Sequence, residues 1–179
     1  MRKLLLVRHA EAAACSPEGD LARELTLQGR TDAGRMGAYL CQMRLIPDLA
    51  LASPARRALD TLDAILQVLP RVAREVNPSL YNADTDTLHD VVAETPGSVR
   101  TLLIVGHNPG IAEFARLLVS GRDKGAPLPR NFPAPCIAVI DLECDPWHDM
   151  GTAHARLDSF MSFANLPGYD HIPRAQKMR

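Results

Sequence analysis

The sequence lacks an excess of charge of either sign. Its 179 residues contain 21 Asp and Glu against 20 Lys and Arg, which gives a formal net charge of −1. A chain balanced in this way has no overall electrostatic field that would attract nucleic acid or an anionic membrane. We therefore expect no nucleic-acid partner and no membrane, and any anion site must come from a local group of cationic side chains.

Paired cysteines and long apolar runs are also missing. Cys15, Cys41, Cys136 and Cys144 show no Cys-x-x-Cys spacing, so we expect reduced thiols rather than a disulfide framework. Four consecutive apolar residues precede Arg8, which are too few for the core of a signal peptide or for a membrane span. These features predict a cytoplasmic protein.

Neither an internal repeat nor a long low-complexity segment divides the chain. Its length suits one domain with a substantial core, and 46% of its residues are hydrophobic. We assign residues 1–163 to a single domain and residues 164–179, which contain Pro and Gly, to an irregular C-terminal tail.

Apolar runs alternate with helical patterns along most of the chain. The runs predict strands over 2–7, 48–53, 71–76, 101–105, 136–142 and 153–160, and the helical spacing of apolar residues predicts helices over 28–44, 54–69, 86–94 and around 111–118. Residues 121–135, with four prolines, are expected to form a loop. Strands that alternate with helices favour an α/β fold, a three-layer α/β/α sandwich with a mostly parallel central sheet.

Polar and cationic residues follow three of the predicted strands. The segments read "VRHAEA" (7–12), "ASPARRALDT" (52–61) and "IVGHNPGI" (104–111). Ligands of parallel sheets bind beyond the carboxyl ends of the strands. We therefore expect Arg8, His9, Arg57 and His107 to meet at one edge of the sheet.

The same segments predict helix starts. Ser53-Pro54 and Asn108-Pro109 each place a capping residue before a proline, the order preferred at an N-cap and the first helical position. Helix N-termini present free backbone N–H groups, which suit a phosphate. The residues at this edge include no acidic metal ligand, so no metal is expected. The expected ligand is a phosphoryl group bound through paired hydrogen bonds from arginine side chains.

His9 is the candidate nucleophile in this set. An attacking imidazole must be neutral, and a guanidinium about 4 Å away disfavours its protonated form by roughly 4 kcal/mol at an effective dielectric of about 20. Histidine can carry a phosphoryl group covalently and so divide one displacement into two. His107 is expected to stabilise the transferring oxygens as a hydrogen-bond donor.

These motifs resemble those of the histidine phosphatase superfamily. "LVRHAEA" is similar to its Arg-His-Gly signature, with Ala10 in place of glycine, "SPARRALDT" is similar to its Ser-Pro-x-x-Arg segment, and "VGHNPGI" is similar to its second-histidine segment. The resemblance implies a phosphoglycerate mutase-like fold and a phosphoenzyme formed on His9, with Arg8, Arg57 and His107 in the pocket. It also implies that no metal or other cofactor takes part.

The segment "LARELTLQGR" (21–30) resembles that of the small bacterial phosphohistidine phosphatases of the SixA type. This likeness implies that Arg23 is an extra phosphate or substrate contact. The chain has no clear counterpart to the general acid of larger members, and Asp84, Asp86 and Glu11 are unranked candidates for it. A phosphoramidate such as protein phosphohistidine needs less help from an enzyme acid than an alkyl phosphate does.

The leading hypothesis is a metal-independent phosphatase that forms a covalent phosphohistidine intermediate. Its expected substrate is phosphohistidine in a protein partner, such as a histidine phosphotransfer domain. The alternatives are a phosphatase of small phosphorylated molecules, a metallohydrolase that uses His9 and His107 as ligands, and a phosphate-binding module without turnover. A mutase is disfavoured because 179 residues leave little room for the loops that shield the intermediate from water.

Overall fold

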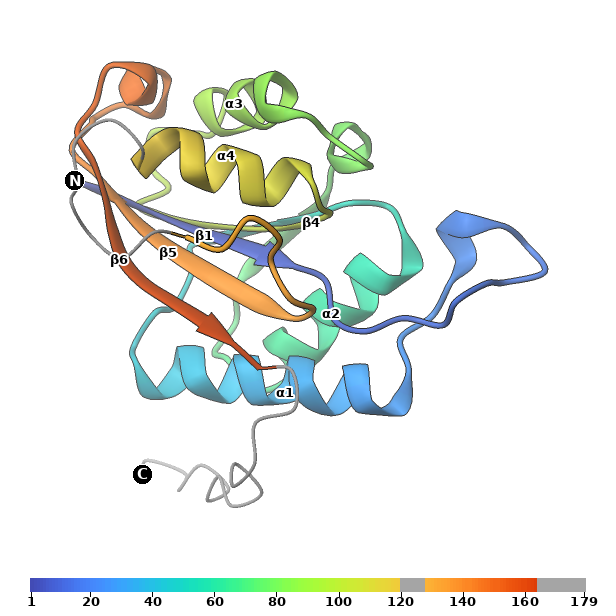
Figure 1. Cartoon of the computed structure of the whole chain (residues 1–179). Helices are drawn as coiled ribbons and strands as arrows, with labels where there is room; N and C mark the ends of the chain where they lie inside the picture. The colour runs from blue at the N-terminus through green and yellow to red at the C-terminus, as the bar shows by residue number, and fades with distance from the viewer. Residues whose placement is uncertain (120–127, 164–179) are drawn as a thin grey trace, which may run out of the picture.

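A central sheet lies between two layers of helices in the computed structural model of the chain (Figure 1). The structure describes residues 1–119 and 128–163. The predicted tail over 164–179 and part of the predicted loop over 121–135 lie outside the described residues. The described residues form an α/β fold with one six-stranded sheet, and the predicted α/β class is confirmed.

The elements agree with the predicted ones to within a few residues at their ends. The strands are β1 (Arg2–Arg8), β2 (Leu49–Ala52), β3 (Ala73–Val76), β4 (Thr101–Gly106), β5 (Cys136–Leu142) and β6 (Ala155–Ser162). The helices are α1 (Leu27–Gln42), α2 (Arg56–Leu66), α3 (Thr85–Ala93) and α4 (Gly110–Val119). Three short 3-10 turns are η1 (Asp20–Ala22), η2 (Pro78–Leu80) and η3 (Trp147–Gly151). Over the described part of the chain, none of the helices is long and apolar enough to cross a membrane.

The sheet has the strand order β3-β2-β4-β1-β5-β6. The pairs β3–β2, β2–β4 and β4–β1 are parallel, whereas β5 runs antiparallel to both β1 and β6. The predicted mostly parallel sheet is thus confirmed. The carboxyl ends of β2, β4 and β1 lie side by side, because these three strands are neighbours and run in the same direction.

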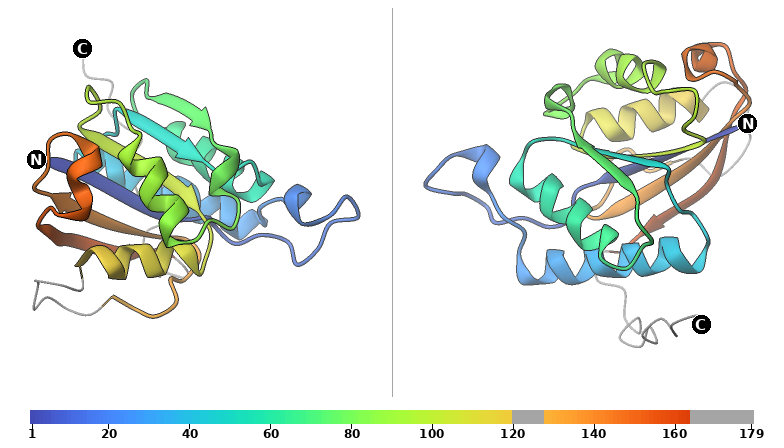
Figure 2. Two further views of the ribbon diagram at one scale, coloured as in Figure 1. Left: turned by 90° about the horizontal axis from the view of Figure 1, so that it is seen from above. Right: turned by 180° about the vertical axis from the view of Figure 1, so that it is seen from behind.

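Alternate residues of the central strands enter two separate cores. Leu4 and Leu6 of β1 belong to the cluster that α3 and α4 cover, and Leu5 and Val7 belong to the cluster that α1 and α2 cover. Figures 1 and 2 show α3 and α4 on one face of the sheet and α1 and α2 on the other. Burial on both faces explains why these strands read as unbroken apolar runs.

Two predicted helix starts are wrong. Helix α2 begins at Arg56 after Ala55, which provides no side-chain cap, and α4 begins at Gly110 rather than at the preceding proline. The Ser53 hydroxyl lies 3.3 Å from the Ala55 amide nitrogen and 2.7 Å from the His107 ring. Ser53 therefore shapes the turn between β2 and α2 and contacts a histidine, instead of capping the helix.

Candidate active site

Two neighbouring strands deliver the two histidines to the same level of the sheet. The β1–β4 register pairs Arg8 with Gly106, so the residue that follows in each strand is His9 or His107. The His9 amide donates to the Gly106 carbonyl at 3.2 Å, which extends the ladder by one bond. The ring centroids lie 5.1 Å apart. The predicted meeting of these side chains is therefore a direct result of strand register.

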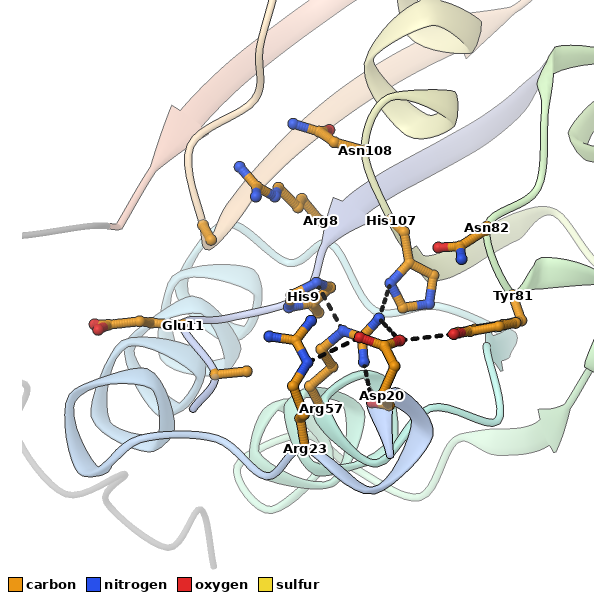
Figure 3. Close-up of a pocket in the computed structure, with 12 residues that line it drawn as sticks. Arg8, His9, Glu11, Asp20, Arg23, Arg57, Tyr81, Asn82, His107 and Asn108 are labelled. Atoms are coloured by element: carbon orange, nitrogen blue, oxygen red, sulfur yellow. Dashed lines mark hydrogen bonds and ion pairs between the residues drawn. The ribbon is translucent and has the colours of Figure 1, made fainter. Parts of the chain in front are cut away.

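Arg57 lies between the two rings (Figure 3). It comes from the first turn of α2, and its side chain is 4% exposed. Its Nε donates to His9 Nε2 at 3.2 Å, and its Nη2 lies 3.4 Å from His107 Nδ1. One guanidinium thus contacts both imidazoles from the helix that follows β2.

The backbone fixes the orientation of the His9 ring. His9 Nδ1 lies 2.7 Å from the Ala10 carbonyl oxygen, which can only accept, so Nδ1 carries the proton. Nε2 then holds the lone pair that accepts from Arg57. Ala10 is itself held by a bond from its amide to Thr61 Oγ1 at 2.9 Å. The nitrogen that faces the pocket is therefore an unprotonated nucleophile.

Burial keeps His9 neutral. Burial is the largest cause, and together with the nearby His107, Arg57 and Arg8 it lowers the pKa of His9 to about 3, against an opposing effect of the Ala10 carbonyl. Removal of an imidazolium from water is costly, which is why desolvation favours the neutral ring. The predicted neutrality agrees with this pKa. The expectation that a guanidinium is its main cause is wrong, because desolvation outweighs each charged neighbour.

His107 is neutral for similar reasons. Burial, followed by Arg57, lowers its pKa to about 4. Its Nε2 lies 2.7 Å from Ser53 Oγ, whereas Nδ1 faces the Arg57 guanidinium, which can only donate. Nε2 therefore carries the proton. His107 can donate to a substrate oxygen from Nδ1 only after it takes up a second proton, which a bound anion would favour.

Arg8 contributes to the pocket from another side. Its Nη1 donates to the Phe132 carbonyl, which also accepts from Asn108 Nδ2 at 3.0 Å. Arg8 Nε and Asn108 Oδ1 are buried and have no hydrogen-bond partner among residues 1–119 and 128–163. Arg8 lines the cavity, and a buried donor without a partner is uncommon in a folded protein.

A cavity of about 470 Å³ joins these groups to residues that the sequence did not single out. Its lining consists of Arg8, His9, Glu11, Ala12, Asp20, Arg23, Arg57, Tyr81, Asn82, His107, Asn108 and Ala134. Arg23 was predicted to lie here, and it does. Asp20 and Tyr81 were missed, although Asp20 has a sequence signal, a Gly-Asp turn three residues before Arg23. The rings of Tyr81 and His107 form a T-shaped pair, with 5.7 Å between the ring centroids.

Two of the three candidate acids lie outside the cavity lining. Asp84 accepts from the Thr87 amide at 2.9 Å as the N-cap of α3, and Asp86 is exposed on the same helix, so neither lines the cavity. Glu11 lines the cavity, but it is exposed and forms no ion pair with an arginine of the described segments. Figure 3 shows its carboxylate pointing away from Arg57. The carboxylate that contacts the arginines of the pocket belongs to Asp20.

The described residues contain no group of three or more His, Cys, Asp or Glu side chains arranged to hold a metal ion. The pocket combines three guanidinium groups, two imidazoles and a phenol around the Asp20 carboxylate, with Glu11 also in its lining. Guanidinium groups bind carboxylates and phosphates through paired hydrogen bonds. The arrangement is therefore suited to a phosphate-sized anion.

Comparison with known proteins agrees with this chemistry. The model of the histidine phosphatase superfamily (branch 1) matches residues 4–95. An uncharacterised protein of Mycobacterium tuberculosis is 30% identical over 173 residues, which cover 94% of this chain and 100% of that protein.

Two solved structures are similar over most of their length. A provisionally assigned phosphohistidine phosphatase SixA from Nakamurella multipartitia has a TM-score of 0.79 and 29% identity, and the match covers 90% of this chain and 95% of that one. A protein from Agrobacterium tumefaciens with the same provisional assignment has a TM-score of 0.77 and 28% identity, covering 90% and 97% of the two chains.

Proposed function

Because the chain belongs to the histidine phosphatase superfamily, we propose that it is a metal-independent phosphatase in which His9 Nε2 takes the phosphoryl group from the substrate. The observation that carries this proposal is the state of His9. Its Nε2 is unprotonated, is directed to Arg57 and lies in a cavity lined by further cationic groups. A neutral imidazole beside guanidinium groups is both a nucleophile and a neighbour of the phosphate oxygens.

In the first step the Nε2 lone pair attacks phosphorus, and the bond from phosphorus to the leaving group breaks. Arg57, Arg8 and Arg23 bind the equatorial oxygens, whose negative charge spreads as the phosphoryl group transfers. The phosphorylated ring of His9 carries a positive charge. Its Nδ1–H bond to the Ala10 carbonyl stabilises that charge and keeps the ring in place.

In the second step water attacks phosphorus and the bond to Nε2 breaks. The electron pair of that bond returns to Nε2, inorganic phosphate leaves with the oxygen of the water, and the protons of the water pass to phosphate and solvent. His107 donates from Nδ1 to a phosphoryl oxygen once the bound anion has raised its pKa. His107 then returns to its neutral form, which its lowered pKa of about 4 favours at neutral pH.

The proposed substrate class is phosphohistidine in a partner protein, such as a histidine phosphotransfer domain. Its leaving group is an imidazole, which departs without the help of a strong enzyme acid. This fits a pocket whose one well-placed carboxylate, Asp20, has its pKa lowered to about 2 by Tyr81 and Arg57 and is therefore charged. The rim residues Glu11, Asp20 and Asn82 are exposed, so a side chain presented by another protein can reach the cavity.

We place this reaction in the cytoplasm, where thiols stay reduced. All four cysteines are free in the structure, two of them exposed and two buried. Burial raises the pKa of the Cys136 thiol to about 12, so this cysteine is an inert packing residue rather than a second nucleophile.

A trapping experiment tests the proposal. The protein is incubated with phosphoramidate and with a phosphohistidine-bearing protein, quenched, and examined for a phosphoryl adduct that acid removes and alkali leaves. We expect the adduct on His9 in the wild-type protein and in His148→Ala, whose histidine is exposed outside the pocket. We expect none in His9→Ala. A fully active His9→Ala enzyme would refute nucleophilic catalysis.

The same assay separates the alternatives. Turnover of sugar phosphates at rates above those of phosphohistidine protein would favour a phosphatase of small molecules. Phosphate binding without turnover of any donor would favour a binding module. Loss of turnover in a chelator, with recovery on addition of a divalent cation, would favour the metallohydrolase and contradict the proposed mechanism.

A further inference from the structure

The Asp20 carboxylate occupies the hydrogen-bond donors of the pocket. Its Oδ2 accepts from Tyr81 at 2.6 Å and from Arg57 Nη2 at 3.0 Å, and its Oδ1 accepts from Arg23 Nε at 2.9 Å. The Asp20 carbonyl also accepts from Arg57 Nη1 at 2.8 Å. Figure 3 shows the carboxylate between Arg57 and Tyr81. The two carboxylate oxygens of Asp20 thus take up the same hydrogen-bond donors that two oxygens of a bound phosphoryl group would need.

A phosphoryl group and this carboxylate cannot share those donors. Both are anions, and their charges repel at such short separation. Each N–H or O–H can form one strong bond, so a phosphate bound by Arg57 must displace Asp20 from at least some of its contacts. The carboxylate is charged at neutral pH, because its bonds to Tyr81 and Arg57 lower its pKa to about 2.

The segment that carries Asp20 contributes no buried residue to the core. None of the residues of η1 is buried, and the Asp20 side chain is 48% exposed. The preceding residue, Gly19, has a φ of 98° and a ψ of −179°, a conformation that is almost confined to glycine. Figures 1 and 2 show this stretch as part of a loop that extends from the body of the molecule. Few buried contacts resist its movement.

We propose that the Asp20 carboxylate is an internal competitor of the phosphoryl group: it occupies Arg57, Arg23 and Tyr81 in the empty enzyme, leaves them when substrate binds, and returns as phosphate departs. This inference rests on the proposed function and adds a means of product release to it. Asp20 thereby sets the affinity of the pocket for phosphate. A pocket with three arginines would otherwise hold its product tightly.

Two other roles of Asp20 make different predictions. If Asp20 only orients Arg57 for the substrate, its removal weakens phosphate binding. If Asp20 is a general acid or base, its removal lowers kcat and changes the pH profile, while the affinity for phosphate stays as it was. The sign of the change in phosphate affinity therefore distinguishes the three roles.

The experiment is calorimetric titration of inorganic phosphate into the full-length wild-type protein, Asp20→Asn, Asp20→Ala and the control Glu18→Gln at one ionic strength. Glu18 lies in the same loop, is exposed and does not line the cavity. We expect Kd to fall by about ten- to a hundredfold in both Asp20 variants, the range that a charge-assisted hydrogen bond supplies. We expect Glu18→Gln to bind phosphate as the wild type does.

Steady-state kinetics with phosphoramidate provides the second measurement. In Asp20→Asn we expect KM and the inhibition constant of phosphate to fall together. An unchanged or raised Kd for phosphate in correctly folded Asp20 variants overturns the inference, and so does a fall in kcat with KM unchanged. If neither the wild type nor any variant binds phosphate, the proposed function itself fails. A missing His9 adduct with tightened phosphate binding refutes covalent catalysis and leaves the competition intact.

Discussion

The pocket has two halves that differ in how deeply their residues are buried. His9, Arg57 and His107 follow strands β1, β2 and β4 and rest against the sheet, and both Arg57 and His107 are buried. Asp20, Arg23 and Tyr81 come from the loop after β1 and the turn after β3, where Asp20 is about half exposed. We call His9, Arg57 and His107 the strand-end half and Asp20, Arg23 and Tyr81 the loop half. The strand-end half is organised before substrate binds, as catalysis requires. The loop half can change its partners without disturbing the core.

Of the variants described here, Arg57→Ala should lower activity the most, because it removes the side chain that contacts both halves of the pocket. Arg57 contacts both histidines and Asp20. We expect kcat/KM to fall by about 10²–10³-fold, as for the loss of one preorganised donor to a transition-state oxyanion. The measurement is turnover of phosphoramidate under conditions in which circular dichroism shows a folded protein.

The matched control for this variant is Arg56→Ala. Arg56 is the preceding residue, 54% exposed, and pairs with Asp60 outside the cavity. We expect its kcat/KM to remain near that of the wild type. Equal losses in the two variants would show that Arg57 acts through the charge or stability of α2 and not through the pocket.

Acid should weaken the strand-end half before it affects the loop half. The folded protein lowers the pKa of His9 to about 3 and of His107 to about 4, from 6.5 in a model imidazole. Below a pH of about 6.5 the unfolded chain therefore binds protons that the folded chain does not. The free energy of unfolding should fall as the pH falls from there toward 4, by about 1.4 kcal/mol per pH unit for each such proton.

Urea unfolding across this pH range measures the effect. We expect a shallower dependence in His107→Gln and a wild-type dependence in His89→Gln, whose side chain is 41% exposed and outside the cavity. Asp20 should contribute only below about pH 4 and down to about pH 2, because the folded protein lowers its pKa from 3.8 to about 2. A His107→Gln protein as sensitive to acid as the wild type would contradict the assigned role of burial.

Gly19→Ala should change stability and phosphate affinity the least, and its effect should be limited to the loop half of the pocket. The positive φ of Gly19 costs an alanine about 1 kcal/mol or more, and the exposed loop can relax to avoid that cost. We expect a loss of at most about 1 kcal/mol in stability, together with tighter phosphate binding, because Asp20 is placed less well. The measurements are urea unfolding and phosphate titration.

Gly34→Ala is the control for this glycine. Gly34 lies inside α1, where an added Cβ meets nothing within 4 Å. We expect a gain of about 0.5–1 kcal/mol in stability, as is usual for this change in a helix, with phosphate affinity unchanged. A large loss of stability in Gly19→Ala would mean that the loop is more firmly packed than its exposure indicates.

The sequence predicted the strand-end half well because its placement depends on local pattern. The unbroken apolar runs before His9 and His107 identify strands buried on both faces, and parallel strands bring their carboxyl ends to one edge. Position in the chain was sufficient to predict that Arg8, His9, Arg57 and His107 would meet. The helix starts were less well predicted, because Ser53 contacts His107 instead of capping α2.

The loop half was predicted only for Arg23, and that through a family resemblance. Tyr81 is 61 residues from Asp20, and nothing in the spacing of either residue indicates that they bond. From the sequence Asp84 was named as a candidate acid and Asp20 was not, although both are acidic residues in polar segments. The structure separates them: one caps α3, and the other lies among arginines.

The sequence by itself determined the order of the elements, the parallel core of the sheet and the set of cationic groups at its edge, because hydrophobic periodicity and strand direction are properties of the chain read locally. The tertiary structure alone decided which carboxylate contacts the arginines of the pocket and which nitrogen of each histidine carries the proton. It also decided how strongly burial lowers the pKa of each histidine. Those outcomes depend on contacts and solvent exclusion between segments far apart in the chain, and no local pattern records them.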